Sequence, residues 1–170
     1  MYEEFGDIIK TMIFNSYDYT ANITITLNAL NDRKNGKNYS LSDHICSMVF
    51  ALLSNQRPWK HIADNQEKIK TLFNNFDVDF IKKTNYQYFV SKLLDLHCGN
   101  RQILKQMQSL KDNIETLERI AKDYGSVDNY YNNTNIKELL KSLSGGKYKL
   151  KQMGVPLVSE YLKGVGMDVI

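Results

Sequence analysis

Residues 40–59, SLSDHICSMVFALLSNQRPW, decide the fold because they join the clearest helical pattern of the chain to an unusual polar turn. Apolar residues recur at three- and four-residue steps over about residues 42–53, which would place them on one helical face. These residues are Leu41, Ile45, Met48, Val49, Leu52 and Leu53. Ser40 with Asp43 three positions later resembles a capping box. The stretch therefore predicts a mostly buried helix that leads directly into the turn.

The remainder of the chain repeats the helical pattern. A second apolar stripe begins at Ile103, continues to Ala121 and ends before Gly125. Only residues 23–27 alternate apolar and polar side chains, and there is no internal repeat. Further helices are expected to start at Pro58, after caps at Asp77, Thr84 and Thr134, and at about Val155. The sequence thus predicts an all-α multi-helix orthogonal bundle.

Length and composition restrict the class of protein. A chain of 170 residues suits one domain, and 42% hydrophobic with 24% charged residues excludes wholesale disorder. No run approaches the roughly 20 apolar residues of a membrane span, and the N-terminus lacks a signal pattern, so we expect a cytoplasmic protein. Cys46 and Cys98 have no metal-site spacing, so neither a metal nor a cofactor is expected.

Positive charge is concentrated near the C-terminus. Residues 137–163 carry six lysines against Glu138 and Glu160, a local balance of plus four in a chain of net charge +3. Such a local excess indicates a surface that meets a polyanion. A solvated lysine face is the commoner interpretation, and charge alone does not decide between them.

The turn after the first helix is the first candidate site. Asn55, Gln56 and Arg57 form a polar tip, stiffened by Pro58 and followed by Trp59, the only tryptophan. Amide and guanidinium groups can replace base hydrogen bonds, so the tip would serve as a wedge in a DNA duplex. The alternative is an ordinary turn with a tryptophan anchored in the core.

A lysine-bearing turn near the C-terminus is the second candidate. Lys149 and Lys151 precede Gly154, and a helix with Pro156 in its first turn follows. Glycine permits close approach of the backbone, and free amides at a helix N-terminus form an anion site. The turn would hold a phosphate of a nucleic-acid backbone, unless it is a simple connection between helices.

Together the two segments resemble the helix-hairpin-helix DNA glycosylases of base-excision repair, the endonuclease III-like superfamily. Leu53-Ser54-Asn55-Gln56 is similar to the family's Leu-Ser-x-Gln segment, and residues 150–162 overlay on its hairpin motif without gaps. In this overlay Gln152 and Gly154 occupy the two glycine positions. The turn at residues 96–101 and the segment at 144–149 strengthen the joint pattern, which covers about residues 40–170.

The resemblance implies a set of roles. Gln56 would enter the duplex where a damaged nucleotide is turned out, supported by Asn55 and Arg57. Lys149, Lys151, Gln152 and Gly154 would hold the DNA backbone. Pro156 occupies the position of the lysine of the bifunctional enzymes, so Schiff-base lyase chemistry is not implied, and the cysteines of an iron–sulfur cluster are absent.

The resemblance also divides the chain into N-terminal helices over residues 1–40, a helical barrel-like core over 41–145 and a helix-hairpin-helix over 146–164. The family's catalytic aspartate would fall a few positions beyond Ile170, so we expect a protein truncated before its C-terminal helices and inactive in hydrolysis. Asp168 is the one carboxylate after the hairpin helix and a weak catalytic candidate.

The alternative function is a non-catalytic helical interaction module or an oligomeric remnant of the glycosylase fold. Apolar residues of the N-terminal segment would lack their usual cover and favour self-association. They are Ile8, Ile9, Ile13 and Phe14. His44, His61 and His97 are interpreted as satisfied or exposed side chains, and Tyr130 and Tyr131, beside several asparagines, as part of a loop.

Overall fold

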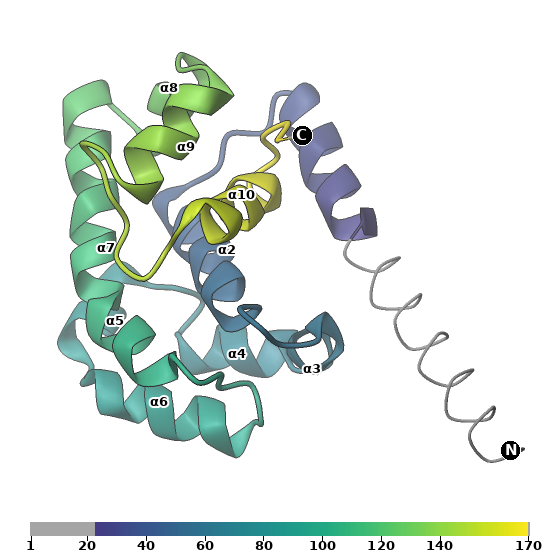
Figure 1. The fold of residues 1–170 in the computed structure, drawn as a ribbon, viewed down its shortest axis with the longest axis vertical. Helices are drawn as coiled ribbons and strands as arrows, with labels where there is room; N and C mark the ends of the chain where they lie inside the picture. Colours follow the sequence, from purple (N-terminus) through teal and green to yellow (C-terminus); the bar gives the residue numbers. More distant parts are fainter. Residues whose placement is uncertain (1–22, 170) are drawn as a thin grey trace, which may run out of the picture.

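The computed structural model describes residues 23–169, and within this range it contains helices, turns and loops but no strand (Figure 1). Residues 23–34 are helical. The helices that follow are α2 (Leu41–Leu53), α3 (Trp59–Ala63), α4 (Gln66–Leu72), α5 (Val78–Lys83), α6 (Tyr86–Asp95), α7 (Ile103–Tyr124), α8 (Val127–Asn132), α9 (Ile136–Ser144) and α10 (Val155–Gly164). The expected all-α class is confirmed for these residues. The apolar side chains expected at Ile8, Ile9, Ile13 and Phe14 lie outside them.

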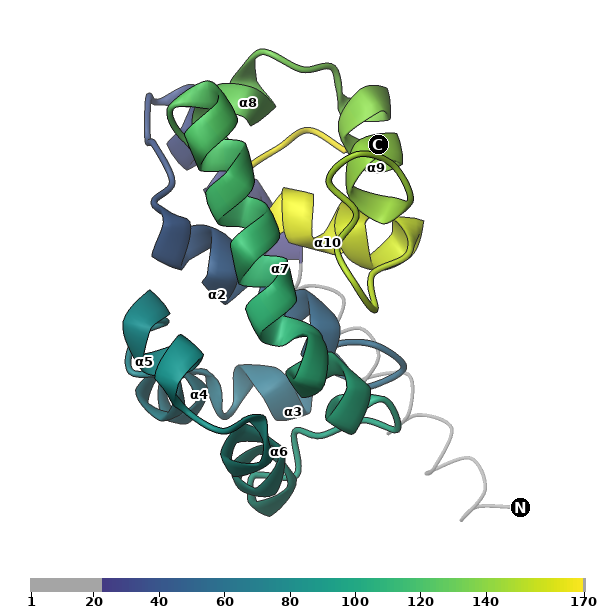
Figure 2. The same cartoon turned by 90° about the vertical axis from the view of Figure 1, so that its left-hand side faces the viewer.

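Helix α7 is the longest element and organises the others. Its 22 residues span about 33 Å. Helices α3 to α6 gather at one end of α7, and α8 and α9 lie at the other (Figure 2). Helices α2 and α10 pack against each other, and α2 also contacts α7. No helix within residues 23–169 is both long and apolar enough to cross a membrane.

The two apolar stripes form the core as expected. Ile45, Met48 and Leu52 of α2 are fully buried, and the stripe of α7 faces them. Helix α7 ends at Gly125, whose φ of 86° lies in the left-handed region that favours glycine. Burial of these stripes supplies most of the driving force for folding.

Local caps start several of the helices. The Ser40–Asp43 capping box is present, and the Asp77 carboxylate accepts the Phe80 N–H at 2.7 Å, as predicted. The caps expected at Thr84 and Thr134 are wrong, because Asn85 and Asn135 occupy these positions. An Asn side chain is the stronger N-cap.

Two further expectations are corrected, whereas the helix at residues 23–34 agrees with the helices expected before residue 40. Pro58 precedes the first residue of α3 and occupies its N-cap. Tyr130 and Tyr131 do not lie in a loop. They belong to α8, which the Ser126 hydroxyl caps by accepting the Asn129 N–H, and both side chains are buried.

Candidate functional site

The polar tip at residues 54–58 is held in an unusual backbone conformation. Gln56 has a φ of 56°, in the left-handed region, and its side chain is exposed. For a residue with a Cβ this conformation costs about 1 kcal/mol. Arg57 donates from Nη1 to the backbone carbonyl of His97 at 2.7 Å, and His97 itself has a φ of 55°. Two left-handed turns therefore support each other at this edge.

The base of the tip is attached to the start of α7. The Leu52 carbonyl, at the end of α2, accepts hydrogen bonds from the Asn100 amide at 2.9 Å and from the Gln106 amide at 3.0 Å. Gln106 is fully buried. The turn at residues 96–101 and the tip, which the resemblance joined only by pattern, therefore form one folded unit.

The position of Trp59 bears on whether the tip is a DNA wedge or an ordinary turn with an anchored tryptophan. Its ring packs edge-on against Phe50 with centroids 6.1 Å apart, and it is half-buried. The tryptophan is thus an anchor at the base of the turn. Gln56 remains exposed, so the anchoring of Trp59 leaves the wedge interpretation open.

The lysine-bearing loop, residues 145–154, is fastened to the middle of α7. The Asn113 side chain accepts the Lys151 N–H at 2.6 Å and donates to the Lys151 carbonyl at 3.0 Å. Gln152 takes a φ of 62°, whereas Gly154 is extended with a φ of −80°. The tight bend expected at Gly154 therefore lies at Gln152.

The N-terminus of α10 has the features of an anion site. No side chain caps it, and Gly154 and Val155 are exposed. Pro156 has no N–H, so the free backbone amides at this end are those of Val155 and Leu157. Lys149 is exposed and makes no ion pair within the described part of the chain, while Lys151 pairs with exposed Asp112 at 2.5 Å.

The tip and the lysine-bearing loop are attached to the same face of α7. Gln106 holds the base of the tip and Asn113 holds the loop, and residues seven apart lie on one face of a helix. Their separation along the helix axis is about 10 Å. Exposed Lys105 precedes Gln106, and exposed Arg101 follows Asn100. The two predicted segments are thus anchored about two turns apart on one face of α7.

A cavity of about 630 Å³ lies beside the tip, between the helix at residues 23–34, α2 and α10. Its lining includes Tyr39, Phe50, Trp59, Asp43 and Glu160. Asp43 is held by the capping box, and Glu160 pairs with Lys163 at 3.1 Å. Sequence reasoning missed this cavity because its walls come from four separate segments.

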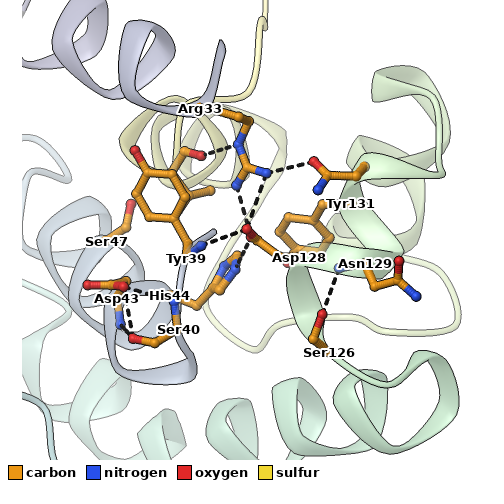
Figure 3. Close-up of polar contacts among 12 residues, drawn as sticks. Arg33, Tyr39, Ser40, Asp43, His44, Ser47, Ser126, Asp128, Asn129 and Tyr131 are labelled. Carbon is orange, nitrogen blue, oxygen red and sulfur yellow. Dashed lines mark hydrogen bonds and ion pairs between the residues drawn. The ribbon is translucent and has the colours of Figure 1, made fainter. Parts of the chain in front are cut away.

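A second polar cluster lies inside the fold, around Asp128 (Figure 3). Its Oδ1 contacts His44 Nε2 at 2.8 Å and the Arg33 guanidinium at 2.9 Å, and its Oδ2 accepts the Tyr39 backbone N–H at 2.6 Å. Asp128 is 3% exposed and His44 is fully buried. Arg33 also donates to the Val165 carbonyl at 2.7 Å. We call Arg33, His44, Asp128, Tyr131 and Tyr161 the buried polar cluster.

The protonation states of this cluster follow from its contacts. Burial alone would raise the pKa of Asp128, but hydrogen bonds from His44, Arg33 and the Tyr39 N–H lower it to about 2. Burial lowers the pKa of His44 more than Asp128 raises it, so the imidazole is neutral. Burial raises the pKa of Tyr131 and of Tyr161, so both phenols stay protonated.

These states orient the hydrogen bonds. Ionised Asp128 can only accept, so His44 Nε2 carries the proton and Nδ1 accepts from the Tyr161 hydroxyl at 2.8 Å. The Tyr161 oxygen then accepts from Tyr131 at 2.9 Å. Each member is satisfied, and Tyr131, Tyr161 and His44 have no exposed surface. The cluster therefore ties α2, α8 and α10 together and offers no group to a substrate.

Other chemistry-bearing residues are isolated. Asp168 is exposed after α10. Burial raises the pKa of Cys46 to about 12, so its thiol is protonated and a weak nucleophile. Over residues 23–169, no group of three or more His, Cys, Asp or Glu side chains is arranged to hold a metal ion.

Comparison with family models, curated proteins and solved structures found no match to this chain.

Proposed function

We propose that the protein binds duplex DNA and turns out a damaged base, as the helix-hairpin-helix glycosylases that it resembles do before they hydrolyse the N-glycosidic bond. The observation that carries the proposal is the attachment of the tip and the lysine-bearing loop to one face of α7, through Gln106 and Asn113. A wedge and a backbone contact can act on one duplex only if both reach it from the same side.

Each segment has a distinct role in this proposal. Gln56 enters the stack, because its left-handed backbone directs an exposed, flexible amide outward from a rigid turn. The uncapped N-terminus of α10, with Lys149 and Lys151 close in sequence, binds a backbone phosphate. Arg101 and Lys105 add sequence-independent attraction between the two.

The cavity beside the tip receives the extruded base. Its volume of about 630 Å³ lies within the range of small-molecule sites. Phe50 and Trp59 provide aromatic walls on which a base can stack. Ser54 and Arg57, on the tip itself, line its mouth, so a base displaced by Gln56 has a short path into it.

Duplex binding is tested by fluorescence anisotropy at low salt with Gln56→Ala and Lys149→Glu. Both should weaken binding, and Lys149→Glu should also lower the salt slope by about one unit or more. Lys92→Glu is the matched control, because Lys92 is an exposed lysine of α6 outside both candidate segments. No duplex affinity of the unaltered chain at low salt would refute the proposal.

Base extrusion is tested with 2-aminopurine in the duplex, whose fluorescence rises when the base leaves the stack. The unaltered chain should raise the signal, and Gln56→Ala should reduce the rise by about tenfold at saturating protein. If the protein binds the duplex without any rise in fluorescence, the DNA-binding part of the proposal stands and the base-extrusion part is refuted. Free base released from damaged duplex is measured on the same samples, and no release is expected, because Asp168 is exposed and isolated.

A second candidate function is self-association through the N-terminal helical segment. Ile23, Ile25 and Leu27 are 40%, 39% and 52% exposed, which is high for apolar side chains. Light scattering with Leu27→Asp tests it. A dimer that dissociates in this variant, with unchanged DNA affinity, would support the interaction module instead.

A further inference from the structure

A second cavity, of about 430 Å³, lies where the C-terminal end of α7 meets α8 and α9. Three tyrosines form one wall, and two lysines line it. We call it the tyrosine pocket. Its lining includes Tyr124, Tyr130, Tyr148, Lys141 and Lys147. The tyrosine pocket includes no residue of the tip, and it includes neither Lys151 nor Asn113.

The tyrosines form an aromatic cluster of tilted and edge-on rings with one accessible member. The rings of Tyr124 and Tyr130 have centroids 4.5 Å apart, and those of Tyr130 and Tyr148 are 5.4 Å apart. Tyr130 and Tyr148 are buried, whereas Tyr124 is 40% exposed. The two buried rings therefore fix Tyr124 in place, and an immobile, exposed aromatic ring stacks a planar ligand at low entropic cost.

A cation is positioned over the neighbouring ring, that of Tyr148. Lys147 is exposed, and its Nζ lies 4.6 Å from the centroid of Tyr148. Gly146 brings the backbone against α9, because a Cβ there would lie 3.0 Å from the Ser142 Cα. Glycine therefore favours the close approach that places Lys147 at the pocket, because any larger residue would push the backbone away by a few tenths of an ångström.

The acidic groups nearby are already engaged. The Asp123 carboxylate accepts the Tyr148 hydroxyl at 2.5 Å and lies 3.8 Å from Lys147 Nζ. Glu138 accepts from the Asn135 amide at 3.1 Å. Lys141 is exposed and makes no ion pair within residues 23–169. A ligand phosphate would therefore meet cations that are partly or wholly free.

The pocket continues the proposed DNA surface. The lysine-bearing loop runs along α7 and contacts it at two points. Lys151 of the loop bonds to Asn113, and the Lys147 carbonyl accepts from Arg119 at 3.4 Å. Six residues of helix correspond to about 9 Å. A strand held at Lys149 and Lys151 would therefore reach Lys147 with its next few phosphates.

We propose that the tyrosine pocket binds one unpaired nucleotide of a single strand adjoining the duplex. Its base stacks on Tyr124, and its phosphate pairs with Lys147. Tyrosine rings stack every base, so the pocket recognises strand state and not sequence. The inference rests on the proposed function, because the duplex part of the strand is held by the loop and the tip.

The test compares duplexes with blunt ends and with short single-stranded overhangs of either polarity, by anisotropy at fixed salt. The unaltered chain should bind one overhang about tenfold more tightly than the blunt end. Tyr124→Ser and Lys147→Gln should each abolish most of this difference, and Tyr124→Phe should keep it. Tyr88→Ser is the matched control, because Tyr88 is 44% exposed on α6.

The outcomes separate the two proposals. Equal affinity for blunt and overhanging ends, or the same loss in Tyr88→Ser as in Tyr124→Ser, would overturn the tyrosine pocket and leave duplex binding intact. If no duplex binds, the proposed function fails, and a short single-stranded oligonucleotide then tests the pocket alone. Oligonucleotide binding that depends on Tyr124 would support the tyrosine pocket. Absence of binding to this oligonucleotide would overturn the tyrosine pocket together with the proposed function.

Discussion

The buried polar cluster and the surface of the tip and loop use similar residue types in opposite ways. Around Asp128 each polar atom of the cluster faces a partner within the fold, and the side chains have almost no exposed area. At the surface, Gln56 and Lys149 are exposed without an ion pair or side-chain hydrogen bond in residues 23–169, and Gln56 also carries backbone strain. The first pattern stabilises a fold, and the second leaves groups free for a ligand.

This contrast separates stability from binding in testable terms. Substitutions in the buried polar cluster should change the free energy of unfolding strongly and DNA affinity only through loss of folded protein. Substitutions at the surface should change affinity while the free energy of unfolding stays constant or rises.

Asp128→Asn should have the largest effect. The asparagine keeps the shape of the side chain but leaves the Arg33 charge without its counter-ion in a nearly buried position. Breaking such a pair typically costs about 3–5 kcal/mol. Urea denaturation followed by circular dichroism measures it. Asp95→Asn is the control, since its pair with Lys92 is exposed and 3.8 Å long, and a loss below about 0.5 kcal/mol is expected there.

The pH dependence of stability should follow the same cluster. Burial holds the pKa of folded His44 below its ordinary value of 6.5, so its contribution to stability is complete above pH 6.5 and declines as the pH falls. The pKa of Asp128 falls from 3.8 to about 2, so its contribution of about 2 kcal/mol is complete above pH 3.8 and is lost toward pH 2. Both make stability rise with pH.

Urea titrations at a series of pH values measure these two contributions. His44→Gln should flatten the dependence between about pH 5 and 6.5, where carboxylates contribute little. A slope in this range that is unchanged by His44→Gln would show that the folded protein accepts a proton at His44.

Gln56→Gly should shift stability and binding in opposite directions. Glycine relieves the left-handed strain at φ 56°, so the free energy of unfolding should rise by about 1 kcal/mol while duplex affinity falls by about tenfold. Gln152→Gly, at φ 62°, should be stabilising for the same reason. Gln108→Gly, in the interior of α7, is the control and should be destabilising by about 1 kcal/mol. Thermal unfolding with anisotropy on the same samples checks all three.

The helices could be predicted because their signals are local. The stripe of α7 and the Ser40–Asp43 box each lie within a few turns of chain, and both are confirmed. The errors at Thr84 and Thr134 arose where a capable asparagine follows directly, so the sequence offered two caps and the geometry chose one. Tyr130 and Tyr131 were misassigned because neighbouring asparagines resemble a loop.

The site was predictable only in part. The spacing of Gln56 and Gly154 came from the resemblance to a family, and their attachment to one face of α7 depends on Gln106 and Asn113, which show no motif. The buried polar cluster could not be predicted, because His44 and Asp128 are 84 positions apart. Such contacts are fixed by packing and leave no local pattern.

Gly154→Ser should have the smallest effect on stability, and it tests directly whether the lysine-bearing loop contacts DNA at Gly154. At φ −80° and ψ 178° any residue is accommodated, and the nearest atom to an added Cβ is the Pro156 Cδ at 3.8 Å. Serine is also a good N-cap for α10, so a change within about 0.3 kcal/mol is expected, with a gain favoured. The structure of the free protein therefore gives glycine no steric reason to occupy position 154.

A ligand would supply that reason. If a DNA phosphate approaches the backbone at Gly154, the serine side chain occupies its place, and duplex affinity should fall by about fivefold with an unchanged melting temperature. Gly145→Ser is the matched control, because its Cβ would also meet open space and Gly145 lies at the other end of the loop, where α9 ends. Equal affinity of both variants and the unaltered chain would remove Gly154 from the interface and leave the phosphate to the lysines alone.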